Sequence, residues 1–431
     1  MRQFGCNLPC CCCATNLNPS SQVQQGSALI NGQPNITIIV LDTLRLDEFR
    51  KLWRSGSLSK LGRFIVLDSC IAPAPWTLPS HASLLTGMYP SKHGAHETRS
   101  VKALDIEKIK LRKRTMVSDL KDIGYTTYCI SANPYVHPLY GFDEFDFFKE
   151  ESYYTDLAGH AIEVPKRLKP LLSKYRERYG GSFVKIGFAM LRDDPALITE
   201  ITGLPMTGYL TFRNLLRKLR AKAIEGWPLE KGGHNTVAMV RAQKFKEPFF
   251  LFINIMEAHD PYMSGKGKDM KWYSSFLKEG PGQELVSKWK RLYAKASRMG
   301  YGYAAEIVEE LVKRYGDDQV IILTSDHGQE FGEHGFIGHG SALHDEIVRV
   351  PLAVMVPKRF SAGKRKGSAS LVNVRPFIEA VIAGDRNATD RLFSKSVYSE
   401  SFGVPGDFTI VKGIDKDKLN KAERRQRRSF R

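Results

Sequence analysis

The stretch that decides the fold is Ile36-Thr37-Ile38-Ile39-Val40-Leu41, and Asp42 follows it directly. This short run is apolar and rich in β-branched residues, which is typical of a strand buried on both faces of a parallel sheet. In open α/β sheets, ligands bind at the carboxyl ends of the strands. Asp42 therefore lies where a functional site is expected.

Further segments along the chain repeat this pattern. Predicted strands cover residues 124–130, 248–254, 319–324 and 350–356, and helices are predicted over 115–123 and 301–315. Strands that alternate with helices indicate an α/β fold, in which helices cover both faces of a mostly parallel central sheet. One more strand is predicted over residues 396–401.

The composition changes along the chain and predicts its organisation. Residues 1–34 are rich in Asn, Gln, Ser, Gly and Cys, which predicts a disordered arm. Residues 35–358 form the main domain, and within it residues 150–245 are basic and helix-prone, as an insertion or lid. Residues 359–431 form a reduced C-terminal subdomain and a basic tail.

The charge balance limits the classes of partner. The 431 residues carry a formal net charge of +18, which favours anionic substrates or surfaces. The absence of a zinc-finger or RNP-like pattern argues against a specific nucleic-acid partner, whereas the basic insertion or tail leaves peripheral contact with a membrane surface open. No run of about 18 apolar residues predicts a spanning helix, and no secretory signal is recognised, so we expect a cytoplasmic protein.

Asp326 and His327 follow the predicted strand 319–324. A carboxylate and an imidazole at adjacent positions on such a turn can both bind one divalent metal ion. His334 and His339 follow within a glycine-rich stretch, and glycine lets the backbone approach a ligand closely. Together with Asp42, these residues predict a metal site, and the alternative is a flexible polar loop.

Thr77 lies in the segment Trp76-Thr77-Leu78-Pro79. A helix is predicted from Pro79 to Thr86, with Gly87 as its C-terminal cap. The positive partial charge at a helix N-terminus favours an alkoxide and a bound oxyanion, and metal coordination lowers the pKa of a hydroxyl. Thr77 is thus a candidate nucleophile, and the alternative is a residue that only caps the helix.

His259 stands in the third polar cluster, His259-Asp260-Pro261-Tyr262. Its imidazole could bind a metal, bind an oxyanion or protonate a leaving group. The alternative is a loop histidine bonded to the backbone. Glu257 is close enough in sequence to add a carboxylate.

Taken in order, these motifs resemble the sulfatase-like branch of the alkaline phosphatase superfamily. The matching segments are residues 40–45, 76–87, 259–262, 324–328, 333–335, 338–340 and 349–352. The resemblance spans roughly residues 34–360. It implies an alkaline-phosphatase-like sandwich with a small C-terminal subdomain.

The resemblance also implies site roles. Asp42, Asp326 and His327 would bind a divalent metal (zinc, manganese, calcium or magnesium), and Thr77 would be the metal-bound nucleophile. Three histidines receive catalytic roles: His81 replaces an arginine that sulfatases place four residues after the nucleophile, His259 resembles a substrate-contacting histidine, and His339 stands where many sulfatases carry a lysine. Asn133, near the position of the family's Lys-and-His segment, and His93 are predicted to contact the substrate.

Two departures from the family pattern shape the predicted function. Sulfatases carry cysteine or serine at the nucleophile position, which maturation oxidises to formylglycine, but the β-carbon of Thr77 carries a methyl group and cannot follow this route. Thr43 replaces the second carboxylate of the sulfatase Asp-Asp pair. Threonine nucleophiles occur in phosphodiesterase and phosphonate-hydrolase relatives, which often carry two zinc ions. Only Glu257, His259 and His339 offer a second site here, so we expect one metal ion and keep a second open.

The predicted function is a metal-dependent hydrolase of anionic phosphate-type esters: a phosphodiester, a phosphomonoester or a phosphonate. Three alternatives remain. They are a sulfatase that works without formylglycine, a transferase of the phosphoglycerol or phosphoethanolamine type, and a degenerate family member that binds anions or a membrane surface.

Overall fold

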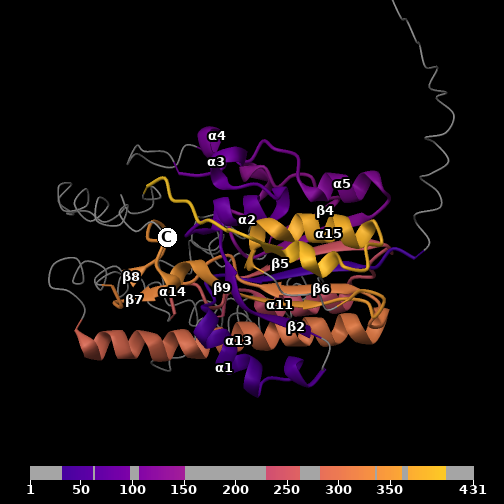
Figure 1. Cartoon of the computed structure of the whole chain (residues 1–431). Coiled ribbons are helices and arrows are strands. Elements are labelled where there is room, and N and C mark those ends of the chain that lie inside the picture. Colours follow the sequence, from indigo (N-terminus) through magenta and orange to yellow (C-terminus); the bar gives the residue numbers. More distant parts are fainter. Residues whose placement is uncertain are drawn as a thin grey trace, which may run out of the picture.

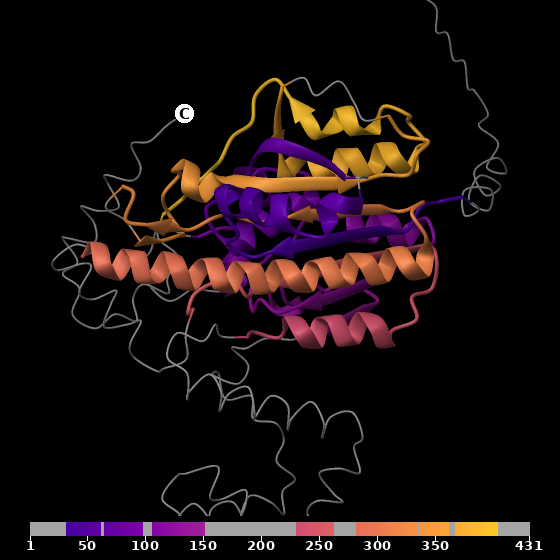
Figure 2. The same ribbon diagram turned by 90° about the horizontal axis from the view of Figure 1, so that it is seen from below.

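A nine-stranded sheet forms the centre of the molecule (Figures 1 and 2). The structure is a computed structural model that describes residues 32–61, 64–97, 106–150, 230–262, 282–334, 337–361 and 367–403. Across the sheet, the strands are β11 (Phe393–Ser394), β10 (Ser368–Ser370), β2 (Phe64–Ile71), β9 (Arg349–Met355), β6 (Val320–Thr324), β1 (Ile36–Leu41), β5 (Phe249–Ile255), β3 (Thr126–Ser131) and β4 (Phe147–Glu150).

Strand β1 lies in the middle of this sheet and pairs in parallel with β5 on one side and β6 on the other. All six of its residues are buried, as its apolar run predicts. The predicted strand 350–356 is present as β9, but it runs antiparallel to both β6 and β2. The sheet is therefore mixed and mostly parallel, with three parallel neighbours at the centre whose carboxyl ends share one edge.

Helices cover both faces of the sheet, as predicted. One face packs against α1 (Leu46–Ser55), α11 (Gly233–Ala242) and α13 (Gln283–Tyr315), and the other against α2 (Thr77–Thr86), α5 (Met116–Asp122) and α15 (Val374–Ile382). The alternation of β1 divides its side chains between two apolar cores, with Ile38 and Val40 in one and Ile39 and Leu41 in the other.

The predicted helices exist, but their bounds differ. Residues 301–315 are the second half of α13, which has 33 residues. Helix α2 begins at Thr77 and ends at a left-handed Gly87, so it starts two residues earlier than predicted. Strand β2 was missed. Its pairing with β9 shifts between Leu67 and Cys70, where Asp68 and Ser69 interrupt the apolar run that marks a buried strand.

The C-terminal part of the described chain adds β10 and β11 to one edge of the same sheet. The predicted strand over residues 396–401 is wrong, because this segment has no regular secondary structure. Its alternating polar and apolar side chains resemble the pattern of a strand, but its backbone forms hydrogen bonds with segments other than a neighbouring strand. Glu400 N donates to the Pro73 carbonyl at 2.9 Å, and the Glu400 carboxylate accepts bonds from the amide and the hydroxyl of Ser91.

Three predicted features fall mainly outside the described residues. They are residues 1–31 of the N-terminal arm, 151–229 of the insertion and 404–431 of the tail. Among the helices that the structure describes, none is both long and apolar enough to cross a membrane. The cytoplasmic location stays a prediction.

Candidate active site

The polar residues at the carboxyl ends of β6, β1 and β5 lie side by side. Asp42 follows β1, Asp326 and His327 follow β6, and Asn254 is the penultimate residue of β5. The two carboxylates and the imidazole each offer a ligand atom, and these atoms lie within 4.8 Å of one another. The structure thus assembles the predicted metal ligands from segments far apart in the sequence. We call Asp42, Asp326, His327 and Thr77 the metal cluster.

Both carboxylates of the metal cluster carry a buried oxygen without a hydrogen-bond partner, Oδ1 of Asp42 and Oδ2 of Asp326. Burial raises the pKa of each acid to about 6, and in Asp42 the charge of Asp326 adds to this effect. Two adjacent buried carboxylates are costly unless a cation compensates them. The unpartnered oxygens therefore fit a divalent metal ion.

His327 is oriented as a metal ligand. Its Nδ1 lies 3.0 Å from the Gly328 carbonyl, which can only accept, so Nδ1 carries the proton and Nε2 keeps its lone pair. Nε2 lies 3.3 Å from Asp326 Oδ2 and 3.4 Å from Thr77 Oγ1. Burial lowers the pKa of His327 to about 4, so the ring is neutral at pH 7, as a ligand must be.

Thr77 is the first residue of α2, and it is buried, with an exposed fraction of 3%. The cap position belongs to Trp76, whose side chain makes no capping bond and instead donates to Glu97 Oε2 at 2.7 Å. The Thr77 hydroxyl is therefore not used as a cap. It receives a hydrogen bond of 3.3 Å from the Asn133 amide and faces His327.

Two amides fix the first carboxylate. Nδ2 of Asn133 donates to Asp42 Oδ2 at 2.7 Å, and Nδ2 of Asn254 donates to the same oxygen at 3.2 Å. Asn133 was predicted as a substrate contact, and the structure places it as a bridge between Asp42 and Thr77. Asn254 was missed, although a single amide inside the apolar run Phe249–Ile255 is a signal that could have pointed to it.

His81 is completely buried, and both its ring nitrogens are engaged within the protein. Nδ1 donates to the Thr77 carbonyl at 2.9 Å, and Nε2 accepts from Asn254 Nδ2 at 3.2 Å. Burial lowers the pKa of this ring to about 3. His81 links the first turn of α2 to the amide that holds Asp42, and its catalytic role stays a prediction.

His93, the second predicted substrate contact, lies apart from this group. It ends α3 (Pro90–His93), its Nε2 lies 2.9 Å from Ser83 Oγ, and its Nδ1 accepts from Ala95 N at 3.0 Å. Burial lowers the pKa of His93 to about 4. These contacts describe a histidine that fastens α3 to α2.

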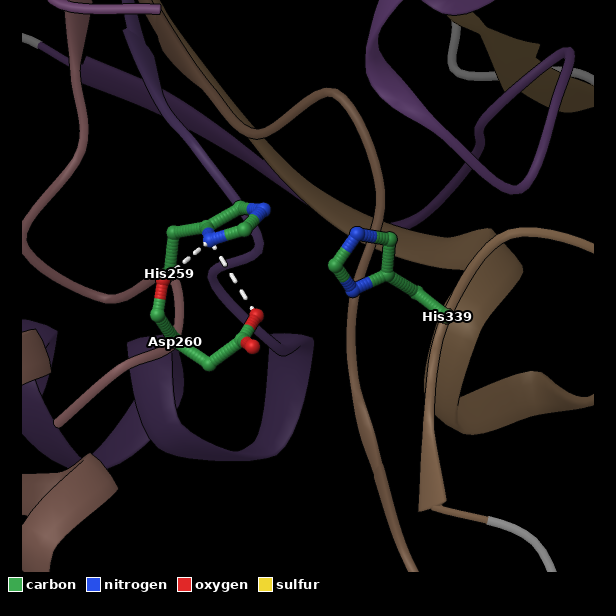
Figure 3. Close-up of side chains that lie close together, drawn as sticks. All are labelled: His259, Asp260 and His339. Carbon is green, nitrogen blue, oxygen red and sulfur yellow. Dashed lines mark hydrogen bonds and ion pairs between the residues drawn. The ribbon is translucent and has the colours of Figure 1, made fainter. Parts of the chain in front are cut away.

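His259 and His339 face each other (Figure 3). Their ring centroids lie 4.9 Å apart, and the ring of His339 lies 4.5 Å from that of His327. Nδ1 of His259 donates to Asp260, with its carbonyl at 2.6 Å and its carboxylate at 3.1 Å, and Nδ1 of His339 lies 2.6 Å from Gln329 Oε1. We call His259 and His339 the histidine pair. Because the partners of both Nδ1 atoms are oxygen acceptors, Nδ1 carries the proton in both rings, and the lone pair of each ring is on Nε2.

The order of these residues along the chain matches a known family. The model of that family, named Sulfatase, matches residues 34–381. The chain belongs to the sulfatase family. This confirms the resemblance to the sulfatase-like branch and places the metal cluster in a family of ester hydrolases that typically hold a divalent metal ion.

Individual sulfatase-family relatives are distant. The chain is 21% identical over 323 residues to an uncharacterised sulfatase of Escherichia coli (strain K12), and the match covers 68% of this chain and 56% of that protein. It therefore spans little more than half the length of this relative.

Solved structures support the fold. A phosphonate monoester hydrolase from Silicibacter pomeroyi aligns with a TM-score of 0.52 at 14% identity, covering 81% of this chain and 73% of that one. A 2-O GAG sulfatase aligns with a TM-score of 0.51 at 13% identity, covering 85% and 76%. At these identities the likeness shows the fold alone, and it confirms the predicted alkaline-phosphatase-like α/β architecture.

Glu257 was considered as a ligand of a second metal ion, but its carboxylate points toward the start of α11. Its Oε1 accepts from the backbone amides of Lys231 at 3.2 Å and Gly233 at 2.8 Å, at the start of α11. The carboxylate nearest the histidine pair is Asp260, which offers a ligand atom within 4.8 Å of theirs. Sequence proximity had suggested Glu257, whereas the direction of its side chain is set by packing against the start of α11.

Proposed function

We propose that this chain is a metal-dependent hydrolase of phosphate-type esters and that Thr77 is its nucleophile. The observation that carries the proposal is the setting of the Thr77 hydroxyl. It stands at the N-terminus of a ten-residue helix, 3.4 Å from His327 Nε2, and it is not used as a cap. A threonine in this place cannot become formylglycine, so a route through its own oxygen is the chemistry that these residues support.

Asp42 Oδ1, Asp326 Oδ2, His327 Nε2 and Thr77 Oγ1 are the atoms that would hold the metal. A bound divalent cation lowers the pKa of a hydroxyl ligand and offsets negative charge on the transferring group. Asn133 contributes independently, because its N–H donates to Thr77 Oγ1 and stabilises that oxygen when it carries charge. The N-terminal end of α2 adds a positive partial charge at the same point.

The reaction then has two displacements. Thr77 Oγ1 loses its proton to solvent and attacks phosphorus, while the bond from phosphorus to the leaving oxygen breaks and that oxygen takes the electron pair. The histidine pair is placed to donate a proton to the leaving oxygen or to bind the phosphoryl oxygens. Water then attacks the phosphothreonine, the Oγ1–phosphorus bond breaks, and Thr77 recovers its proton.

A panel of p-nitrophenyl esters tests the proposal. The purified chain is assayed on a phosphodiester, a phosphomonoester, a phosphonate monoester and a sulfate ester, with zinc, manganese, magnesium or calcium added. We expect metal-dependent cleavage of at least one phosphorus ester, a phosphothreonine at residue 77 on rapid quenching, and a loss of roughly 10⁴-fold or more in kcat for Thr77→Ala.

Thr86→Ala is the matched control, because it removes the same atoms from a buried threonine at the other end of α2. It should keep its kcat near that of the unchanged chain. Cleavage of the sulfate ester alone, or unimpaired turnover by Thr77→Ala, contradicts the proposal. Transfer of the phosphoryl group to an added alcohol in preference to water would redefine the enzyme as a transferase.

A further inference from the structure

A second cluster of histidines and carboxylates lies in the segment that follows the metal cluster. It joins β7 (Glu330–Phe331) and the following turn to the start of α14 (Asp345–Val348). His344 Nδ1 lies 2.8 Å from Glu330 Oε1, and His334 Nε2 lies 3.0 Å from Glu346 Oε2 and 3.8 Å from Glu330 Oε1. The two imidazole rings lie 4.0 Å apart, so four potential ligands converge from two separate elements.

Glu330 is the unusual member of this cluster. Its side chain is completely buried, and its Oε2 has no hydrogen-bond partner. Burial, together with the charges of Glu346 and Glu333, raises its pKa to about 8. The charge of Arg45 acts in the opposite direction, but its guanidinium already forms ion pairs with Glu333 and Asp47. Among the residues that the structure describes, no Lys or Arg forms an ion pair with the Glu330 carboxylate, and a bound cation would supply the missing positive charge.

The donor set identifies the kind of cation. Glu330, His334 and His344 each offer a ligand atom, and these three atoms lie within 4.8 Å of one another, with the Glu346 carboxylate next to His334. Two imidazoles and two carboxylates suit zinc, which prefers four tetrahedral nitrogen, sulfur or oxygen ligands at about 2.0–2.2 Å. Only a modest closure is needed, and His334, whose side chain is 45% exposed, has room to make it.

We propose that Glu330, His334, His344 and Glu346 form a second divalent-metal site, of the zinc type and separate from the metal cluster. Four protein ligands leave no position for a substrate, so the site is structural. A bound metal ion would connect β7 to α14 and thereby fix the distance between residues 330 and 346. His339 lies between these two residues in the sequence. The metal would thereby hold one member of the histidine pair in place.

Zinc binding to the full-length chain tests this site directly, in a background that removes competing sites. The background carries Asp42→Asn, Asp326→Asn and His259→Gln, which break the metal cluster and the group of His259, Asp260 and His339, and serine at Cys6, Cys10, Cys11, Cys12 and Cys13. Equilibrium dialysis against Zn²⁺ should find one equivalent bound, and Co²⁺ should give the visible absorption of a tetrahedral nitrogen–oxygen site. His344→Gln and His334→Gln, each added to this background, should weaken zinc binding by about 100-fold or more, beyond the cost of losing one outer hydrogen bond to a ligand.

His137→Gln is the matched control, because His137 also lies beside a glutamate, Glu150 at 3.8 Å, but is not part of a cluster of three ligands. It should leave zinc binding unchanged. If the background chain binds no zinc, or binds it equally well after His334→Gln and His344→Gln, the site does not exist. His334 is exposed enough for its variant to fold even where His344→Gln does not. Neither result bears on Thr77, so this test fails independently of the ester panel.

Discussion

The metal cluster and the histidine pair lie against each other but are built differently. The metal cluster occupies strand ends and the first residue of a helix, and its four side chains are at most 3% exposed. The histidine pair lies outside helices and strands and is half-buried, and its Nδ1 atoms bond to Asp260 and Gln329. In the proposed mechanism, a sheet edge fixes the group that would activate the nucleophile, whereas loops carry the group that would meet the rest of the substrate. Loops vary more readily than strands, so the histidine pair is where specificity for the leaving group can differ.

The largest expected effect tests the metal cluster. Asp42→Asn keeps the shape of the side chain but removes the charge that a metal requires, so we expect loss of the bound metal at this site and a fall of about 10³-fold or more in kcat/KM. Metal analysis and ester kinetics on the same preparation measure both. If the Asp42→Asn variant kept full metal content and activity, the cluster would not be the metal site.

The same variant carries a stability signature. The folded-state pKa of Asp42 is raised from 3.8 to about 6, so the penalty of its charge is absent below pH 3.8, grows between the two values and is complete above pH 6. In metal-free protein, Asp42→Asn should therefore raise the free energy of unfolding by roughly 3 kcal/mol at pH 7.5 and by much less at pH 4.5. Urea unfolding at both pH values measures this, and a destabilised variant at pH 7.5 would contradict it.

An intermediate effect is expected at the histidine pair. His259→Gln should lower kcat by about 10²-fold for esters with a poorly acidic leaving alcohol and far less for p-nitrophenyl esters, because only the former need a proton on the leaving oxygen. Metal content should stay unchanged, which separates this pair from the metal cluster. His96→Gln, a change at a histidine that stacks on Phe402, is the control and should behave as the unchanged chain. An equal loss on both kinds of ester would assign His259 to phosphoryl binding instead of proton transfer.

The smallest effect concerns the support of the loop that carries His259. The buried Lys231 ammonium donates to the carbonyls of Met256, Glu257 and His259. Lys231→Met leaves these carbonyls without that donor, so we expect kcat/KM to fall by roughly tenfold through loss of alignment, with metal content unchanged. Lys51→Met, at a lysine whose side chain is 68% exposed, is the control and should not alter the kinetics. Loss of metal from the Lys231 variant would mean that the two regions are not separable.

The sequence by itself determined the central strands and pointed to the residues that the structure gathers in the metal cluster. The apolar, β-branched run of residues 36–41 is typical of a strand buried between two covered faces, and this placed Asp42 at the sheet edge. Local patterning of this kind also placed Asp326 and His327 after a strand and predicted a helix from Pro79, which in the structure begins at Thr77. It failed at β2, where Asp68 and Ser69 break the run, and at residues 396–401, where alternation did not lead to pairing.

Only the tertiary structure decided what the remaining polar side chains do. His81 and Glu257 were candidates by position, yet each is turned toward a partner inside the fold. Asn254 meets Asp42 across 212 residues, and the amide of Thr43 meets Asp326 across 283. A buried polar atom must find a partner, but which partner it finds depends on how the elements pack together. The sequence therefore determined which polar side chains follow the strands, and long-range packing determined the direction in which each of these side chains points.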